Sequence, residues 1–257
     1  MQIYAIIKAS KKGLKMKKAF TLVELIFVVV VIGILAFSLW PKKQPIQALA
    51  AARQIVAHIR YTQHLALNDD KFATHIDTGG TDSIAKDWYK RLWRITFSDI
   101  KADKDCKIGG WRYAVYQNIA GDLSDKGQPN GTIEAARNPA QAGKVLSACY
   151  SGLSTNTSDE LNLSQTYKIK NIDFSEFAEG GKIQGIIFDE LGRAYPRGEW
   201  DAPYGNKHKF SQDNGSFGRI KLSAKDRSKA NILVFAETGY ACVENVDLGC
   251  QAPATNP

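Results

Sequence analysis

The sequence predicts an α+β protein in which a long N-terminal helix is followed by a β-rich domain. Three observations support this fold class. An uninterrupted apolar segment occupies residues 20–40, and a helical spacing of apolar residues continues through residues 46–67. From residue 71 onward, short runs rich in Val, Ile, Tyr, Phe and Trp alternate with turn residues. A helix followed by a series of strands is typical of α+β folds.

The composition of the 257 residues is that of an ordinary globular chain. Hydrophobic residues make up 44% and charged residues 23%, which excludes a disordered or collagen-like protein. The formal charge is +8, but residues 1–18 contribute six lysines and no acid. Without them, 28 basic residues face 26 acidic ones. The basic excess therefore belongs to the N-terminus, which argues against a broad nucleic-acid-binding surface on the domain.

Residues 20–40 form a 21-residue segment with a single charge, Glu24. About 20 apolar residues cross a bilayer core, so we expect one membrane-spanning helix here. Six lysines precede the segment, and two, Lys42 and Lys43, follow it closely. Because the cytoplasmic flank carries the basic excess, we expect a cytoplasmic N-terminus and a domain outside the cytoplasm from about residue 42.

Three interpretations of this apolar segment compete. It is a plain anchor, a secretory signal peptide cleaved after Ser38, or an anchor with a functional carboxylate. The apolar core is longer than the roughly 7–15 residues of a signal peptide, which disfavours cleavage at Ser38. A carboxylate at membrane depth costs roughly 2.5–3.5 kcal/mol on insertion scales and implies a partner. Glu24 therefore favours the third interpretation.

Residues 41–70 are predicted to form a second, amphipathic half of the helix. One face carries apolar or small residues at spacings of three and four: Ala48, Leu49, Ala52, Ile55, Val56, Ile59, Thr62, Ala66 and Leu67. Pro41 and Pro45 predict a loosened joint between the two halves, and Asn68 marks the end of the helical pattern.

Residues 71–257 are predicted to form the β-rich domain. The expected strands are 92–98, 111–117, 145–150, 166–172, 183–189, 219–223, 232–237 and 240–246. Glycine-containing turns separate many of them, and residues 118–144 and 190–218 read as long loops.

The run from Lys17 to Leu25, KKAFTLVEL, leads directly into the apolar helix and resembles the N-terminus of a type IV prepilin or type II secretion pseudopilin. In that family, prepilin peptidase cuts on the cytoplasmic face, and the new N-terminus is methylated. The resemblance places the cut between Ala19 and Phe20, although most members have Gly where Ala19 stands. It makes residues 1–19 a leader, or a shorter one if the chain starts at Met16.

The resemblance also implies an architecture, a location and partners. The fold would be the pilin lollipop, with the long helix packed on the β-rich domain. The chain would sit in the bacterial inner membrane as a single-pass protein with a periplasmic domain. It would meet prepilin peptidase, the inner-membrane assembly platform and other pilins. In the filament, Glu24, the fifth mature residue, would pair with the Phe20 amine of a neighbouring subunit, because low dielectric strengthens such a pair.

The second half of the chain resembles the GspH/FimT group of minor pseudopilins more loosely. Residues 188–192, FDELG, and 232–239, ILVFAETG, fit its late strands, with Tyr240 where Arg is expected. Some members hold DNA with basic residues near that point, so a DNA-binding minor pilin of a competence pilus is the alternative function. The candidate residues are Arg91, Arg94, Arg112, Arg193, Arg197, Lys207 and Lys209. The low charge of the mature chain makes nucleic acid the weaker partner.

Four cysteines, Cys106, Cys149, Cys242 and Cys250, follow the apolar segment and so lie in an oxidising compartment if the topology is right. Four cysteines allow three pairings. Many pilins staple a C-terminal loop, so the resemblance favours Cys242–Cys250 and, with it, Cys106–Cys149. A zinc site is the weaker alternative, since no Cys-x-x-Cys occurs and the histidines do not cluster with the cysteines. The four histidines are His58, His64, His75 and His208.

The chain shows no motif of a serine hydrolase, a zinc protease or a P-loop enzyme, so we expect a structural protein without enzymatic activity or cofactor. An anchored periplasmic enzyme is the third hypothesis. Four acids are candidates for a calcium site, but solvated surface acids are the favoured reading: Asp189, Glu190, Asp201 and Asp213. Asn162, in the run ELNLS, fits an extended bacterial glycosylation sequon.

Overall fold

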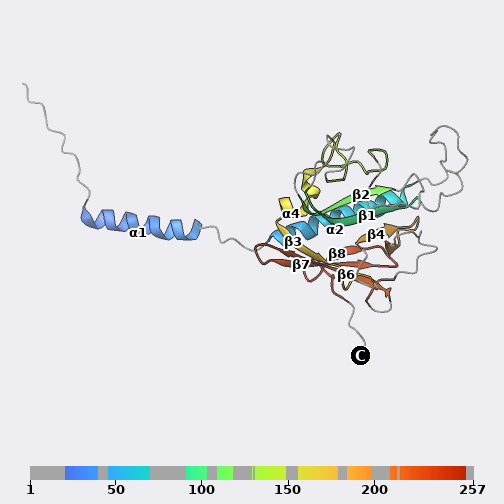
Figure 1. The fold of residues 1–257 in the computed structure, drawn as a ribbon. Helices are drawn as coiled ribbons and strands as arrows, with labels where there is room; N and C mark the ends of the chain where they lie inside the picture. Colours follow the sequence, from blue (N-terminus) through green and yellow to red (C-terminus); the bar gives the residue numbers. More distant parts are fainter. Residues whose placement is uncertain are drawn as a thin grey trace, which may run out of the picture. The chain divides into compact units, whose positions relative to one another are not determined.

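The structure is a computed structural model, shown in Figure 1. It describes residues 21–39, 46–69, 91–102, 109–117, 129, 131–148, 156–178, 184–197, 209–212 and 215–252, with the backbone alone at 36–39. The chain divides into two compact units, Met1–Gln44 and Pro45–Pro257. The joint predicted at Pro41 and Pro45 lies outside the described residues.

In the described part of the first unit, residues 21–39, the chain forms the helix α1 (Leu22–Leu39), of 18 residues. This helix is the described part of the predicted membrane segment 20–40, whose end residues Phe20 and Trp40 are not described. Among the residues that the structure does describe, no helix combines the length and the apolar character needed to cross a membrane.

The second unit contains two antiparallel four-stranded sheets (Figure 1). The first has the strand order β2-β1-β4-β5 and consists of β1 (Trp93–Ile100), β2 (Gly110–Gln117), β4 (Gly185–Phe188) and β5 (Ala194–Pro196). The second has the order β3-β6-β7-β8 and consists of β3 (Ile169–Asp173), β6 (Phe217–Ala224), β7 (Lys229–Phe235) and β8 (Ala241–Val243). Two short helices, η2 (Asp159–Leu161) and α4 (Leu163–Thr166), lie between β2 and β3 in the chain.

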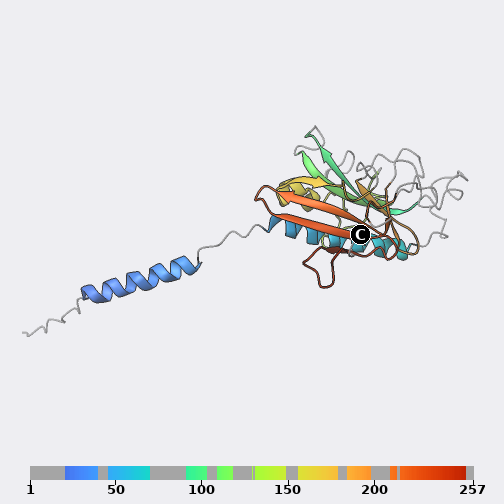
Figure 2. The same cartoon turned by 90° about the horizontal axis from the view of Figure 1, so that it is seen from below.

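The helix α2 (Gln47–Leu67) packs against both sheets, and Figure 2 shows it running along the second one. Its buried face consists of Ala48, Ala51, Ala52, Ile55, Val56, Ile59, Thr62 and Ala66. The small alanines of its first half let the helix lie close to the strands. This face is nearly the one predicted from the apolar spacing, and it belongs to the main core of the unit.

Side chains of both sheets join α2 in that core. Along β1 and β2, Ile95 and Val115 point inward, and Ile220 and Ile232 do so on β6 and β7. Burial alternates along β6, as expected for a strand with one covered face, whereas β1 and β2 are buried at consecutive positions and so are covered on both faces. A chain of ring contacts through Phe97, Phe174, Phe177 and Phe210 connects the two sheets. The second unit is therefore held by one main apolar core that joins α2 to both sheets, with two smaller clusters beside it.

The start of α2 is fixed by the turn between β6 and β7. The residue before the helix, Ile46, has no capping side chain. Instead, Ala48 N–H donates to Ser228 Oγ at 2.9 Å and Gln47 N–H donates to Asp226 Oδ2 at 3.4 Å. These residues satisfy backbone donors that the first helical turn leaves open, and the carboxylate complements the positive end of the helix dipole.

Several strand expectations need correction. Within its described part, the segment predicted as strand 145–150 forms only isolated bridges, which pair Val145 with Arg137 and Thr157 and Ser147 with Ala114. Thr166 ends α4 instead of starting a strand. The predicted loop 190–218 contains β5, a three-residue strand too short to give an alternating signal. The other predicted strands correspond to observed ones with shifted ends.

Candidate functional site

The N-terminus of α1 carries a hydrogen-bonded cap. Thr21 precedes the helix, and its Oγ1 accepts a hydrogen bond from Glu24 N–H at 3.3 Å. Its carbonyl oxygen accepts from Leu25 N–H at 3.1 Å. The pattern Thr-x-x-Glu is the sequence of a capping box, in which Glu or Gln at the third helical position also reaches back to the cap. Our sequence reasoning missed this cap, although the signal, Thr21 three residues before Glu24, was present.

The rest of α1 is apolar and uncovered. Its large apolar side chains from Leu22 to Leu35 are between 38% and 74% exposed. Glu24 is the only ionisable residue between Leu22 and Leu39, and it is exposed as well. Burial of apolar surface contributes about 25 cal/mol per Å², so such a helix is stabilised by contact with lipid or with other helices. The predicted processing residues Ala19 and Phe20 lie outside the described residues.

A disulfide joins Cys242 of β8 to Cys250, the pair that the resemblance implied. Both cysteines are buried, and their Cα atoms are 6.0 Å apart. Within the closed loop, Asp247 Oδ2 accepts from Val243 N–H at 2.8 Å. The predicted partners Cys106 and Cys149 lie outside the described residues.

Residues 188–192 and 232–239 meet at α2. Gln63 Nε2 donates to the carbonyl oxygens of Gly192 and Thr238 at 2.8 and 2.7 Å. Gly239 has a φ of +61°, and a Cβ there would lie 2.0 Å from the Gly192 oxygen. Only glycine fits so close an approach in the left-handed region. Gly192 and Gly239 thus allow the two segments to approach each other closely beside the C-terminal half of α2.

Position 240 holds Tyr240 where the resemblance predicted Arg. An arginine of α2, Arg60, lies beside this tyrosine. The Arg60 guanidinium of α2 lies 5.1 Å from the centre of the Tyr240 ring, and its Nη2 donates to the Tyr240 hydroxyl at 3.3 Å. Arg60 Nε also donates to the Ala241 carbonyl at 3.0 Å. On its other side, Tyr240 stacks on Phe235. The cation here fastens α2 to the second sheet.

The structure argues against Asp189 as a ligand of a calcium ion. Asp189 is fully buried, and its Oδ1 accepts from the backbone N–H groups of Leu191 and Arg193 at 3.0 and 2.8 Å. Its Oδ2 accepts from Arg193 Nε at 2.7 Å and from the Tyr195 hydroxyl at 3.2 Å. These donors leave no oxygen open to a cation. Glu190 has interactions of its own, and Asp201 and Asp213 are not described. Within the described residues, no three metal-binding side chains gather.

The basic candidates for DNA binding are only partly brought together. Arg94 and Arg112 are buried, and Arg94 lies against the Tyr116 ring of β2. Arg193 is ion-paired with Asp189 and lines the same cavity as Lys209. Arg91 and Arg197 are half-buried and have interaction partners, while Lys207 is not described. DNA uptake therefore stays a prediction.

Asn162 acts as a structural cap in the folded domain. It is buried, and its Oδ1 accepts from Gln165 N–H at 3.0 Å at the start of α4. An oligosaccharide could be attached here only before this segment folds. Glycosylation at Asn162 therefore remains a prediction from the sequence, and the Asn162 side chain is not accessible in the folded domain.

The two described histidines of α2 differ in environment. His64 is exposed, whereas His58 is half-buried with its Nδ1 2.7 Å from the Tyr113 hydroxyl. Burial lowers the pKa of His58 from its ordinary value of 6.5, and the opposing influence of Glu160 is smaller. His75 and His208 lie outside the described residues.

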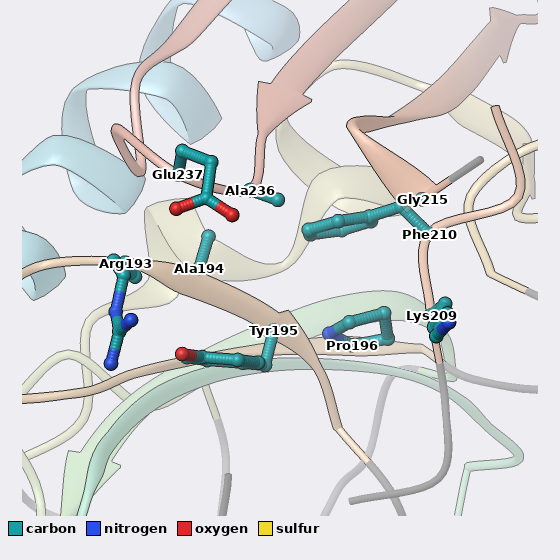
Figure 3. A pocket seen from close by; sticks show the side chains of 9 residues that line it. All are labelled: Arg193, Ala194, Tyr195, Pro196, Lys209, Phe210, Gly215, Ala236 and Glu237. Carbon is teal, nitrogen blue, oxygen red and sulfur yellow. The ribbon is translucent and has the colours of Figure 1, made fainter. Parts of the chain in front are cut away.

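A cavity of about 270 Å³ lies where β5 meets the end of β7 (Figure 3). Ala194, Pro196 and Phe210 give it an apolar floor. Figure 3 shows the Glu237 carboxylate directed into this space, while Lys209 stands at the opposite wall. The cavity has room for one apolar group, but its charged side chains do not converge on a common point as the groups of a catalytic site do.

The comparison with protein families gives one match. Residues 14–40 match the prokaryotic N-terminal methylation motif, the prepilin-type signature found in type IV pilin-like and pseudopilin substrates of prepilin peptidase. The matched region includes the predicted cleavage residues and Glu24. Neither the curated proteins nor the solved structures include a match to the chain.

Proposed function

We propose that the chain is a structural, non-enzymatic filament subunit, a minor pilin or pseudopilin that prepilin peptidase cuts between Ala19 and Phe20. The mature chain assembles into the pseudopilus of a type II secretion system or into a type IV pilus. The match of residues 14–40 to the N-terminal methylation motif carries this proposal. The apolar, uncovered surface of α1 supports it, because a filament core of packed helices would bury that surface.

In this proposal Glu24 has a role between subunits. Cleavage leaves a cationic amine on Phe20, and Glu24 of one subunit would pair with that amine on its neighbour. In a low-dielectric helix bundle such a pair is strong, and an unpaired carboxylate is costly. The capping hydrogen bond from Glu24 N–H to Thr21 uses the backbone of Glu24, so it leaves the carboxylate available for this pairing.

The proposed location is the inner membrane, with the N-terminus in the cytoplasm and the domain in the periplasm. The lysine-rich leader supports this orientation. The buried Cys242–Cys250 disulfide supports an oxidising compartment for the domain. We further propose that the chain belongs to the GspH/FimT group of minor pseudopilins. The contact of Gly192 and Gly239 with each other and with α2 supports this assignment, because it gives a structural role to the two segments that resemble that group.

Intact-mass analysis of the full chain, expressed with and without prepilin peptidase, tests the proposal. With the peptidase, we expect the mass of residues 20–257 plus one methyl group. Ala19→Leu should block cleavage, because the peptidase requires a small residue there. Ala9→Leu, the same change within the leader, should not. An unprocessed chain in the presence of active peptidase, or a new start at Leu39, would contradict the proposal.

A further inference from the structure

A hydrogen-bonded cluster links the middle of α2 to the elements around α4. We call the side chains of Gln54, His58, Tyr113 and Tyr167 the polar cluster. The Tyr113 hydroxyl lies 2.7 Å from His58 Nδ1 and 2.8 Å from Gln54 Nε2. Gln54 Nε2 also donates to the Glu160 carbonyl oxygen at 3.1 Å, and Gln54 Oε1 accepts from the Tyr167 hydroxyl. Three elements, α2, β2 and η2, and the residue that follows α4 thus meet at one set of polar groups.

The hydrogen bonds of the polar cluster determine the protonation state of the His58 imidazole. Both N–H groups of the Gln54 amide are used, one by the Glu160 carbonyl and one by the Tyr113 oxygen. The Gln54 oxygen is occupied by Tyr167. Within this network the hydrogen of the Tyr113 hydroxyl can point only to His58 Nδ1, which must therefore be an acceptor. His58 is neutral, with its proton on Nε2.

Protonation of His58 is incompatible with this arrangement. A hydrogen on Nδ1 would face the Tyr113 oxygen, and the hydroxyl hydrogen of Tyr113 would lose its acceptor. Tyr113 is almost completely buried, so water cannot replace that acceptor without opening the contact. The titratable groups that face the cluster are Tyr113 from β2, Glu160 from η2 and Tyr167 next to α4. Glu160 favours the protonated imidazole, but burial outweighs it.

We propose that the polar cluster is a pH-sensitive contact, which holds α2 against β2 while His58 is neutral and breaks when His58 takes up a proton. The inference does not depend on the proposed function, because it concerns contacts inside the second unit alone. It assigns His58 a positioning role, acting through Tyr113.

The direction of the pH effect follows from the lowered pKa of His58. The folded domain binds the proton less readily than the unfolded chain does, so folding is most favourable above pH 6.5, the ordinary pKa of the group. Stability is lost as the pH falls from that value toward the lowered pKa, and the loss levels off below it. Across this window, each pH unit changes the folding equilibrium constant by up to about tenfold.

The first test compares His58→Gln with His64→Gln in the full chain in detergent. Glutamine at position 58 offers Tyr113 a neutral acceptor, and position 64 supplies the same substitution on the exposed face of the same helix. Thermal unfolding is followed between about pH 8 and about pH 5, where histidine titrates. The wild type and His64→Gln should lose stability on acidification more steeply than His58→Gln. Equal pH dependence of His58→Gln and the wild type would overturn the proposal.

The second test needs no variant at position 58. In the histidine-labelled wild-type chain, nitrogen NMR reports the tautomer and the titration midpoint of each imidazole. The variants His64→Gln, His75→Gln and His208→Gln assign the signals of the other three histidines, so the remaining set belongs to His58. We expect His58 to carry its proton on Nε2 at neutral pH and to titrate below pH 6.5, the ordinary value of the group. A proton on Nδ1, or a midpoint at or above pH 6.5, would refute the inference even if His58→Gln does not fold.

Discussion

The helices α1 and α2 are of similar length but depend on different partners. In α1, with 18 residues, apolar side chains face every direction and are exposed. In α2, with 21 residues, one face is buried in the core, and Ser228 and Asp226 of the β6–β7 turn satisfy its first N–H groups. The apolar face of α2 is therefore covered by contacts within the second unit, whereas the apolar side chains of α1 have no such cover within the described part of the first unit. We expect α1 to provide a surface for assembly and the buried face of α2 a surface for folding.

The largest effect on folding should come from substitution of a buried isoleucine in α2, with an exposed isoleucine in α1 as its control. Ile59 of α2 is fully buried, and Ile32 of α1 is 58% exposed. Ile59→Ala should lower the unfolding free energy of the domain by about 3 kcal/mol, since it removes buried methylene groups and leaves a cavity. Ile32→Ala should leave that free energy unchanged. Denaturant unfolding of the full chain in detergent measures both, and equal losses would mean that α1 also supports the domain.

A smaller effect is expected at the joint between α2 and the glycine turns. Gly239→Ala introduces a Cβ 2.0 Å from the Gly192 oxygen at a left-handed φ, and it should cost about 2 kcal/mol or more. Gly249 is the control, because it has a left-handed φ of +74° with open space around it. Gly249→Ala should cost about 1 kcal/mol. The same unfolding measurement compares them, and equal costs would show that the close approach to Gly192 is unimportant.

The cap on α2 should contribute least. Ser228→Ala removes the acceptor for Ala48 N–H and should cost about 1 kcal/mol, as other helix caps do. It also removes the hydrogen bond from the Ser228 hydroxyl that helps to hold the pKa of Asp226 below its ordinary value, so that pKa should rise while the backbone N–H of residue 228 still donates to Asp226. Ser223→Ala, which loses an exposed hydrogen bond to Asn171, should change stability by less than about 0.5 kcal/mol. Similar values for both variants would contradict the capping account.

The parts of the fold that sequence predicts well are those with a strong repeating pattern. The apolar spacing of α2 located its buried face, and β-branched runs located strands such as β6 and β7. The three-residue strand β5 carries no such pattern and ends in Pro196. The cap at Ser228 also escaped prediction, because it joins residues about 180 positions apart in sequence.

The candidate sites show the same limit. The N-terminal motif was readable because its residues are consecutive, and the family match covers it. The burial of Arg94 and Arg112 and the four hydrogen bonds of Asp189 depend on tertiary packing that a charge pattern does not contain. The cluster around His58 likewise combines residues from α2, β2 and the chain after α4. A charged residue in a sequence is thus a weak predictor of an exposed binding surface, because tertiary packing can bury or pair it.

We expect the Glu24 carboxylate to act between subunits, whereas the Glu24 backbone N–H takes part in the cap of α1, and Glu24→Gln separates these roles. Glutamine can replace glutamate in a capping box, so the substitution preserves the cap and removes only the charge. The measurement is crosslinking of the variant to neighbouring subunits in cells that assemble the filament, with leader removal confirmed by mass. Thr21→Ala, which removes the cap and keeps the charge, is the control. We predict that Glu24→Gln is processed normally but does not crosslink, while Thr21→Ala crosslinks like the wild type. Normal crosslinking of Glu24→Gln would contradict the account.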